Sequence, residues 1–263
     1  MSLLRRNNVK IFGHGEQPML FGHGFGCDQN MWRYITPAFL NRYKIVLFDH
    51  VGSGSSDLIA YDREKYGTLH GYADDVLEIC KYLELENIIF VGHSVGATIG
   101  MLSAIKEPGQ FNKLVLIGPS PCYINDEGYI GGFDKEDIEE MLEHMEHDFV
   151  GWSNMFAPLI MGNSDRPSLG VELTNSFCST DHEIAKHFAK VTFLSDNRKD
   201  LPKLQIQSLI MQCSEDIIVP REVGEYMLSH MKSAQMVYLN ATGHCPNLSS
   251  PLETMTAIES FLA

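Results

Sequence analysis

The hydrophobic positions of this chain form two kinds of pattern that take turns along the sequence. Short runs that are apolar on both faces, which is typical of buried strands, lie at 18–21, 44–49, 88–91, 114–117, 208–213 and 235–239. Stretches with an apolar residue every three or four positions, which is typical of helices packed on one side, lie at 28–41, 68–85, 95–107, 220–231 and 251–262. Residues 8–13 alternate as in an exposed strand. Strands and helices in this order predict an α/β fold with a mostly parallel, doubly wound sheet.

The strand pattern stops between residues 122 and 196. Asp134 with Asp137 indicates the start of a helix, and Thr180 with Glu183 fits a capping box. Apolar residues recur at helical spacing between these two points, at Ile138, Met141, Leu142, Met145, Phe149, Trp152 and Phe156. We therefore expect a helical insertion at 122–196 within a core made of 1–121 and 197–263.

Charge separates the same segment from the rest. The whole chain of 263 residues has a formal charge of −14, and residues 122–196 hold 15 Asp and Glu against 4 Lys and Arg. This balance argues against nucleic acid or an anionic membrane as a partner, because phosphate binding needs clustered Lys and Arg. No run of about 18 apolar residues and no signal-peptide pattern is present, and the six cysteines are scattered. We expect a cytoplasmic protein with free thiols.

Ser94 follows the apolar run 88–91 and lies between Gly92 and Gly96 in a G-x-S-x-G pattern. This pattern is typical of a nucleophile elbow, where a strand turns sharply into a helix and exposes the serine. The alternative is an ordinary helix N-cap. The strand before Ser94 and its candidate partners later in the chain favour the nucleophile.

A serine nucleophile needs a base and a carboxylate that orients the base. Asp216 follows the strand at 208–213, and His244 follows the strand at 235–239. Because the carboxyl ends of parallel strands meet at one edge of the sheet, these residues are expected near Ser94. Glu215 is the alternative carboxylate, and the position in the loop favours Asp216.

The glycine cluster 22–26 follows the strand at 18–21. Its spacing lacks the third glycine of a dinucleotide-binding loop, and no acidic residue follows in the expected place. It fits instead the loop that, with the residue after the nucleophile, forms an oxyanion hole from the N–H groups of Phe25 and Val95. His23 and His93 are expected to brace these loops. No cofactor is indicated, and His144 with His147 lack a third metal ligand.

With these motifs the chain resembles the α/β-hydrolase group that contains the RsbQ-type stress-response regulators of bacilli and the plant karrikin and strigolactone receptors. The matching stretches are 24–29, 49–54, 92–97, 120–126, 131–133, 177–181, 195–196 and 243–246. They include the insertion as well as the core. His50 and His23 stand where Tyr and Pro are expected in the RsbQ type, which leaves open a paralogue with another partner.

The resemblance implies an α/β-hydrolase fold with an inserted four-helix lid over an apolar pocket. It also implies slow hydrolysis of a small hydrophobic ester or lactone, and activation of a PAS-containing PP2C-type phosphatase that switches on the general stress sigma factor. The pocket residues that it implies are Phe133, Trp152, Phe156 and Phe193, beside Phe25 and Val95.

Two functions stay open from the sequence. One is an enzyme, such as a metabolic carboxylesterase or lactonase without a signalling partner. The other is a sensor whose acidic insertion binds a protein and whose turnover is incidental. The acidic face has a plain alternative explanation, since charges also keep an apolar helix pair in solution.

Overall fold

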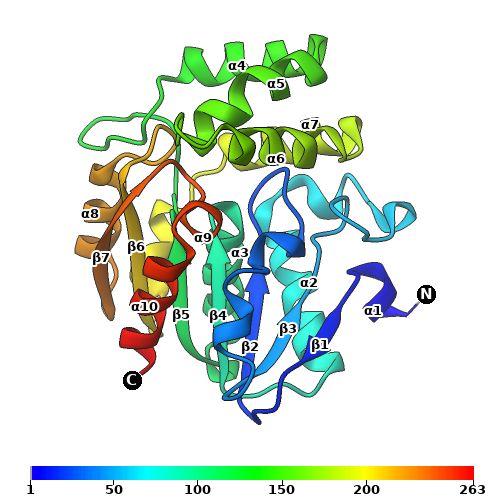
Figure 1. Ribbon diagram of the computed structural model, residues 1–263, viewed down its shortest axis with the longest axis vertical. Coiled ribbons are helices and arrows are strands. Elements are labelled where there is room, and N and C mark those ends of the chain that lie inside the picture. The colour runs from blue at the N-terminus through cyan, green and yellow to red at the C-terminus, as the bar shows by residue number, and fades with distance from the viewer. Residues whose placement is uncertain (1) are drawn as a thin grey trace.

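A central sheet of seven strands runs through the computed structural model, which describes residues 2–263 (Figure 1). The strands are β1 (Lys10–Phe12), β2 (Pro18–Gly22), β3 (Lys44–Leu47), β4 (Ile88–His93), β5 (Phe111–Ile117), β6 (Gln207–Glu215) and β7 (Ala234–Thr242). Their order is β1-β3-β2-β4-β5-β6-β7, with β1 antiparallel to β3 and the other neighbours parallel. The α/β class and the mostly parallel sheet are confirmed.

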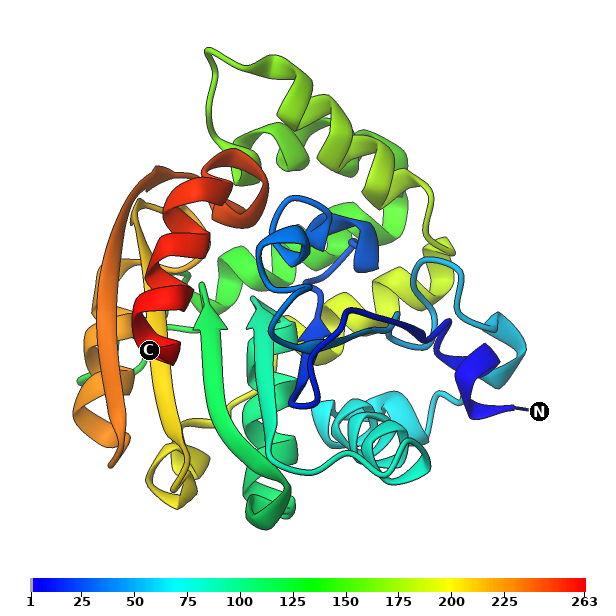
Figure 2. The same ribbon diagram turned by 60° about the horizontal axis from the view of Figure 1, so that its bottom comes forward.

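Helices cover both faces of this sheet and its carboxyl edge. They are α1 (Leu3–Arg6), α2 (Leu69–Tyr82), α3 (Val95–Lys106), α4 (Lys135–His147), α5 (Phe149–Met161), α6 (Pro167–Cys178), α7 (His182–Phe193), α8 (Arg221–His230), α9 (Pro246–Ser249) and α10 (Pro251–Leu262). Figure 2 shows α10 on one face and α2 and α3 on the other. Within residues 2–263, no helix combines the length and the apolarity needed to cross a membrane.

Helices α4 to α7 lie between β5 and β6 in sequence and above the carboxyl ends of the strands in space (Figure 1). The helix start predicted from Asp134 with Asp137 is confirmed, and these two residues form a capping box at the beginning of α4. The apolar repeat from Ile138 to Phe156 belongs to two helices rather than one, because Asp148 has non-helical backbone angles and caps α5 by accepting from Gly151 N–H. The repeat is helical on both sides of this break and therefore did not reveal it.

Two local predictions are wrong. The segment 28–41 forms short 3₁₀ helices at Gln29–Trp32 and Thr36–Ala38 instead of one α-helix. Pro37 supplies no N–H for a continuous helix, although the apolar face that includes Trp32 and Phe39 is buried as expected. The cap of α7 is Asp181, which accepts from Ile184 N–H, whereas the Thr180 hydroxyl donates to Phe177 O.

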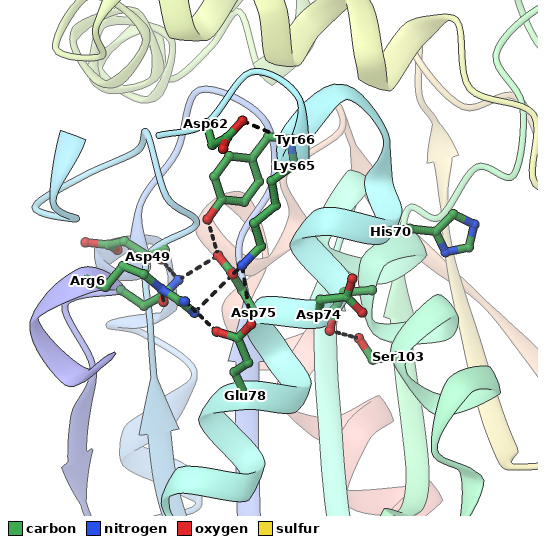
Figure 3. A network of polar contacts seen from close by, with 12 residues as sticks. Arg6, Asp49, Asp62, Lys65, Tyr66, His70, Asp74, Asp75, Glu78 and Ser103 are labelled. Carbon is green, nitrogen blue, oxygen red and sulfur yellow. Dashed lines mark hydrogen bonds and ion pairs between the residues drawn. The ribbon is translucent and has the colours of Figure 1, made fainter. Parts of the chain in front are cut away.

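The N-terminal helix is held to the core by a buried carboxylate. Asp75, on α2, forms ion pairs with Arg6 at 3.0 Å and with Lys65 at 2.6 Å, and it accepts a hydrogen bond from Tyr66 at 2.9 Å (Figure 3). Its side chain is 2% exposed, so these three groups replace water around the charge. Three segments that are distant in sequence therefore meet at one residue.

Candidate active site

Ser94 lies at a sharp turn between β4 and α3. Its φ of 55° and ψ of −128° belong to a region that non-glycine residues seldom adopt. A Cβ on Gly92 would lie 2.5 Å from Ala97 Cα, and a Cβ on Gly96 would lie 2.4 Å from His23 O. Only glycine fits at these two positions, so the local sequence permits the close approach of strand, turn and helix that this conformation needs.

Ser94, His244 and Asp216 form a continuous hydrogen-bonded row. His244 Nε2 lies 2.8 Å from Ser94 Oγ, and His244 Nδ1 lies 2.7 Å from Asp216 Oδ2. The side chains of His244 and Asp216 are 5% and 1% exposed. Glu215 ends β6 with an exposed side chain, so the structure brings Asp216 rather than Glu215 to the histidine.

The environment of Asp216 favours its ionised form. Burial alone raises the pKa of this carboxyl, yet the pKa lies below its ordinary value because His244 and two backbone N–H groups act against burial. These are the N–H groups of Ile218 and Val219, which donate to Oδ1 at 2.8 and 3.1 Å. Oδ2 therefore stays free to accept from the imidazole, which fixes the tautomer that presents Nε2 to Ser94.

His93 and His23 hold the loops around the site in place, as the sequence predicted, and His50 is the partner of His23. His93 Nε2 donates to His244 O at 2.7 Å. Burial, and next the nearby His244, lower the pKa of His93 to about 3, so this ring is neutral. His23 Nε2 accepts from His50 N–H at 3.0 Å, and His50 Nε2 donates to His23 O at 3.0 Å. The loop after β2 is thereby tied to the loop after β3.

The two expected oxyanion donors lie beside the serine. Val95 is the first residue of α3, where the backbone N–H has no partner within the helix. Phe25 lies in the loop after β2 and lines the same cavity as Ser94. Among residues 2–263, neither N–H donates to a backbone carbonyl. Both N–H groups can therefore donate hydrogen bonds to a negatively charged oxygen of a substrate.

A narrow cavity leads to Ser94. Its volume is about 30 Å³. Its lining is Phe25, Cys27, His93, Ser94, Tyr123, Ile160, Leu173, Phe177, Thr192, Phe193, Ile218, His244 and Cys245. Most of these side chains are apolar, and the roof comes from α5, α6 and α7.

The predicted pocket residues are only partly in this lining. Phe25 and Phe193 belong to it, whereas Val95, Phe133, Trp152 and Phe156 do not. Trp152 lies one layer behind, because its ring stacks on Phe177 at 5.7 Å and on Phe156 at 5.4 Å. Phe133 pairs with Ile124 in the segment before α4. The helical repeat identified side chains that face inward but not those that reach the cavity.

Several lining residues escaped the sequence reasoning. Tyr123 is 2% exposed, and burial raises its pKa to about 12, although the nearby Ser94 acts in the opposite direction. Its hydroxyl is therefore a protonated group beside the nucleophile. Cys27 and Cys245 are free thiols, and burial raises the pKa of Cys27 to about 12, which makes it a weak nucleophile.

The histidines of the insertion lie elsewhere. His147 Nδ1 is 2.8 Å from Glu143 O, and the His144 ring packs near Phe156. Across residues 2–263, no three His, Cys, Asp or Glu side chains come together in an arrangement that could hold a metal ion.

Comparisons with known proteins agree with the fold. Residues 17–186 match the family model described as the α/β-hydrolase fold. A karrikin insensitive 2 receptor of Petunia hybrida is 39% identical over 93% of this chain and 91% of its own length. Strigolactone esterase D14 of Arabidopsis thaliana is 37% identical over 96% of this chain and 94% of its own length. The structure of a hydrolase from Oleispira antarctica superposes with a TM-score of 0.96, at 39% identity, and covers 99% of this chain and 96% of that one.

Proposed function

Since the chain belongs to the α/β-hydrolase family, we propose that it is a serine hydrolase that cleaves a small hydrophobic ester or lactone. The observation that carries this proposal is the row of Ser94, His244 and Asp216, with contacts of 2.8 and 2.7 Å, at the end of an apolar cavity. A hydroxyl, a base and an orienting carboxylate at these distances are what acyl transfer requires.

In this mechanism, Ser94 Oγ attacks the carbonyl carbon of the substrate while His244 Nε2 takes its proton. Asp216 keeps the imidazole oriented and stabilises its positive charge. The backbone N–H groups of Phe25 and Val95 donate hydrogen bonds to the carbonyl oxygen as it becomes negatively charged. His244 then protonates the departing alcohol oxygen, and a water molecule releases the acyl group by the same steps in reverse order.

The substrate class follows from the cavity and from the relatives. The lining offers large apolar side chains and no Lys, Arg, Asp or Glu, so a neutral hydrophobic molecule fits best. The relatives include a protein named strigolactone esterase and receptors named for karrikins, and these names support a small ester or lactone. A metabolic carboxylesterase or lactonase without a signalling partner also satisfies these observations.

The test is the hydrolysis of a short-chain p-nitrophenyl ester by the Ser94→Ala variant. We expect the rate to fall by about three or more orders of magnitude, because the attacking oxygen is gone. Ser103→Ala is the matched control, since Ser103 is also a buried serine of the α3 region and its hydroxyl bonds only to backbone carbonyls. Retained activity in Ser94→Ala would overturn the mechanism.

A second function is favoured by the charge of α4. We propose as this alternative an RsbQ-type regulator, in which the insertion binds a PAS-containing PP2C-type phosphatase and hydrolysis serves or resets a stress signal. Its support is the exposed acidic face of α4, where Glu139, Glu140 and Glu143 lie together. Only Glu139 has a cationic neighbour among the described residues, at 3.4 Å in Lys135. Such a face suits a basic surface on a partner.

Substitution of Glu139, Glu140 and Glu143 by Lys distinguishes the two proposed functions. If the acidic face binds the phosphatase, the variant should bind it more weakly and with less dependence on salt, while ester hydrolysis stays unchanged. The measurement is a binding assay with the purified phosphatase at low and at high salt. Equal binding by the variant and the unmodified protein would remove electrostatic docking as an explanation.

A further inference from the structure

Thr192, on α7, has a buried hydroxyl that no other group of the protein satisfies. The residue is 2% exposed and lines the cavity, and within residues 2–263 its Oγ1 has no hydrogen-bond partner. A buried hydroxyl without a partner destabilises a folded protein, so structures normally satisfy it. This exception therefore needs a reason.

Within residues 2–263, Tyr72 and Ser249 also have buried hydroxyls without a partner, but neither residue lines the cavity. Several other helical hydroxyls donate to the carbonyl four residues earlier, as do Ser103, Ser153, Thr174 and Thr254 at 2.7 to 2.9 Å. This local bond is the usual way in which a helix satisfies a buried serine or threonine. The corresponding acceptor for Thr192 is Phe188 O, and the hydroxyl does not use it. The hydroxyl is thus left for another partner.

The reactive groups of the cavity are already engaged with one another. Ser94 and His244 bond to each other, and His93 Nε2 holds His244 O. Thr192 is on α7, in the roof of the cavity, whereas the reactive groups come from the loops of the core. Its neighbour Phe193 packs on Phe25 and Tyr123. Thr192 therefore lies where a part of the substrate other than the reacting ester group would contact the roof.

We propose that Thr192 recognises a second oxygen of the substrate. On this inference, which rests on the proposed serine hydrolase, the ester or lactone carries another carbonyl, ether or hydroxyl oxygen in the part that contacts α7. A threonine hydroxyl both donates and accepts, so it can pair with any of these groups. An entirely hydrocarbon tail would leave the hydroxyl unsatisfied and would bind less well.

The experiment compares esters that differ by one atom. The substrates are p-nitrophenyl pentanoate, ethoxyacetate and 3-methoxypropanoate, in which an oxygen replaces the third or fourth carbon of the chain. The proteins are the unmodified chain, Thr192→Val, which keeps the shape but removes the hydroxyl, and Thr192→Ser, which keeps the hydroxyl. The quantity compared is the ratio of kcat/KM for each oxygen-containing ester to that for pentanoate, because the intrinsic reactivity of each ester cancels between variants.

We expect Thr192→Val to lower this ratio roughly three- to tenfold for at least one oxygen-containing ester, as the loss of one hydrogen bond predicts. Thr192→Ser should keep the ratio within about twofold of the original, for the same reason. Equal effects of Thr192→Val on all three esters would overturn the inference, since they would indicate a merely structural role. In that case hydrolysis that still depends on Ser94 would leave the proposed function intact, whereas hydrolysis that survives Ser94→Ala would overturn both.

A second measurement needs no substrate. If the hydroxyl has no partner in the free protein, Thr192→Val should melt at the same temperature as the unmodified chain or a higher one, because an unsatisfied polar group is removed. A lower melting temperature for Thr192→Val than for Thr192→Ser would show that the protein already satisfies the hydroxyl. That result would overturn the inference independently of the kinetics.

Discussion

At the scale of single residues, His93 shows how burial couples the site to the stability of the fold. Burial lowers the pKa of His93 to about 3, and burial also lowers the pKa values of His23 and His50. The pKa of a histidine side chain in an unfolded chain is ~6.5. Between these values the unfolded chain binds protons that the folded chain does not, so stability is lost as the pH falls below about 6.5.

We therefore expect the free energy of unfolding to fall between pH 7 and pH 5, with His93 contributing about 1.4 kcal/mol per pH unit once the pH is well below ~6.5. Urea unfolding at a series of pH values measures this. The variant His93→Gln, which can still donate to His244 O, should show a shallower dependence than the unmodified chain. A stability that does not change between pH 7 and pH 5 would contradict the prediction.

The sequence identified residues whose place follows from the order of strands and loops, and missed those whose place depends on packing. Ser94, Asp216 and His244 each follow a strand, so the topology alone brings them together. Tyr123 and Thr192 carry no such mark, because their side chains reach the cavity only through the way the insertion packs. Trp152 illustrates the opposite error, because it was predicted to line the pocket and does not. A helical repeat indicates that a side chain is buried, but it does not indicate which residues surround that side chain.

At the scale of elements, the buried carboxylate of Asp75 joins three pieces of the chain. It forms an ion pair with Arg6 of α1, and it accepts hydrogen bonds from Lys65 and Tyr66 in the short 3₁₀ helix Lys65–Gly67 that precedes α2 (Figure 3). Arg6 and Lys65 are themselves 17% and 30% exposed. Without Asp75 their charges would lie next to each other with less compensation.

We expect Asp75→Asn to lower the free energy of unfolding by roughly 2–4 kcal/mol, somewhat less than a fully buried pair because the cations keep some water. Asp74→Asn is the matched control, since Asp74 pairs with Lys106 on the surface and is 50% exposed. This control should lose less than about 1 kcal/mol. Urea unfolding distinguishes the two, and equal effects of both substitutions would contradict the role given to Asp75.

Strands and long helices were predictable because their patterns are long and consistent, and the failures occurred where one residue changes the local geometry. Pro37 converts an apolar helical stripe into two short 3₁₀ helices. Asp148 divides an uninterrupted repeat into α4 and α5. At the start of α7, two adjacent residues could each cap the helix, and Asp181 rather than Thr180 does so.

At the scale of the whole molecule, α4 to α7 lie outside the sheet, and the segment that holds them contributes no strand to it. The sheet pairs β5 directly with β6, although residues 118–206 separate them in sequence. We expect limited proteolysis to cut first at 122–196, because loops outside a hydrogen-bonded sheet open at a lower free-energy cost. Mass spectrometry of the first fragments checks this. A first cut within 88–91, at the centre of the sheet, would be incompatible with this organisation.

The small volume of the cavity also affects how fast a ligand can bind. The cavity has a volume of about 30 Å³, which is less than a p-nitrophenyl ester occupies. Such a ligand can enter only if the roof is displaced. We therefore expect association to reach a limiting rate, set by the frequency of opening, however much ligand is supplied. Because the reactive groups are assembled before the ligand arrives, the opening of the roof would then set both how fast a ligand binds and how long it stays.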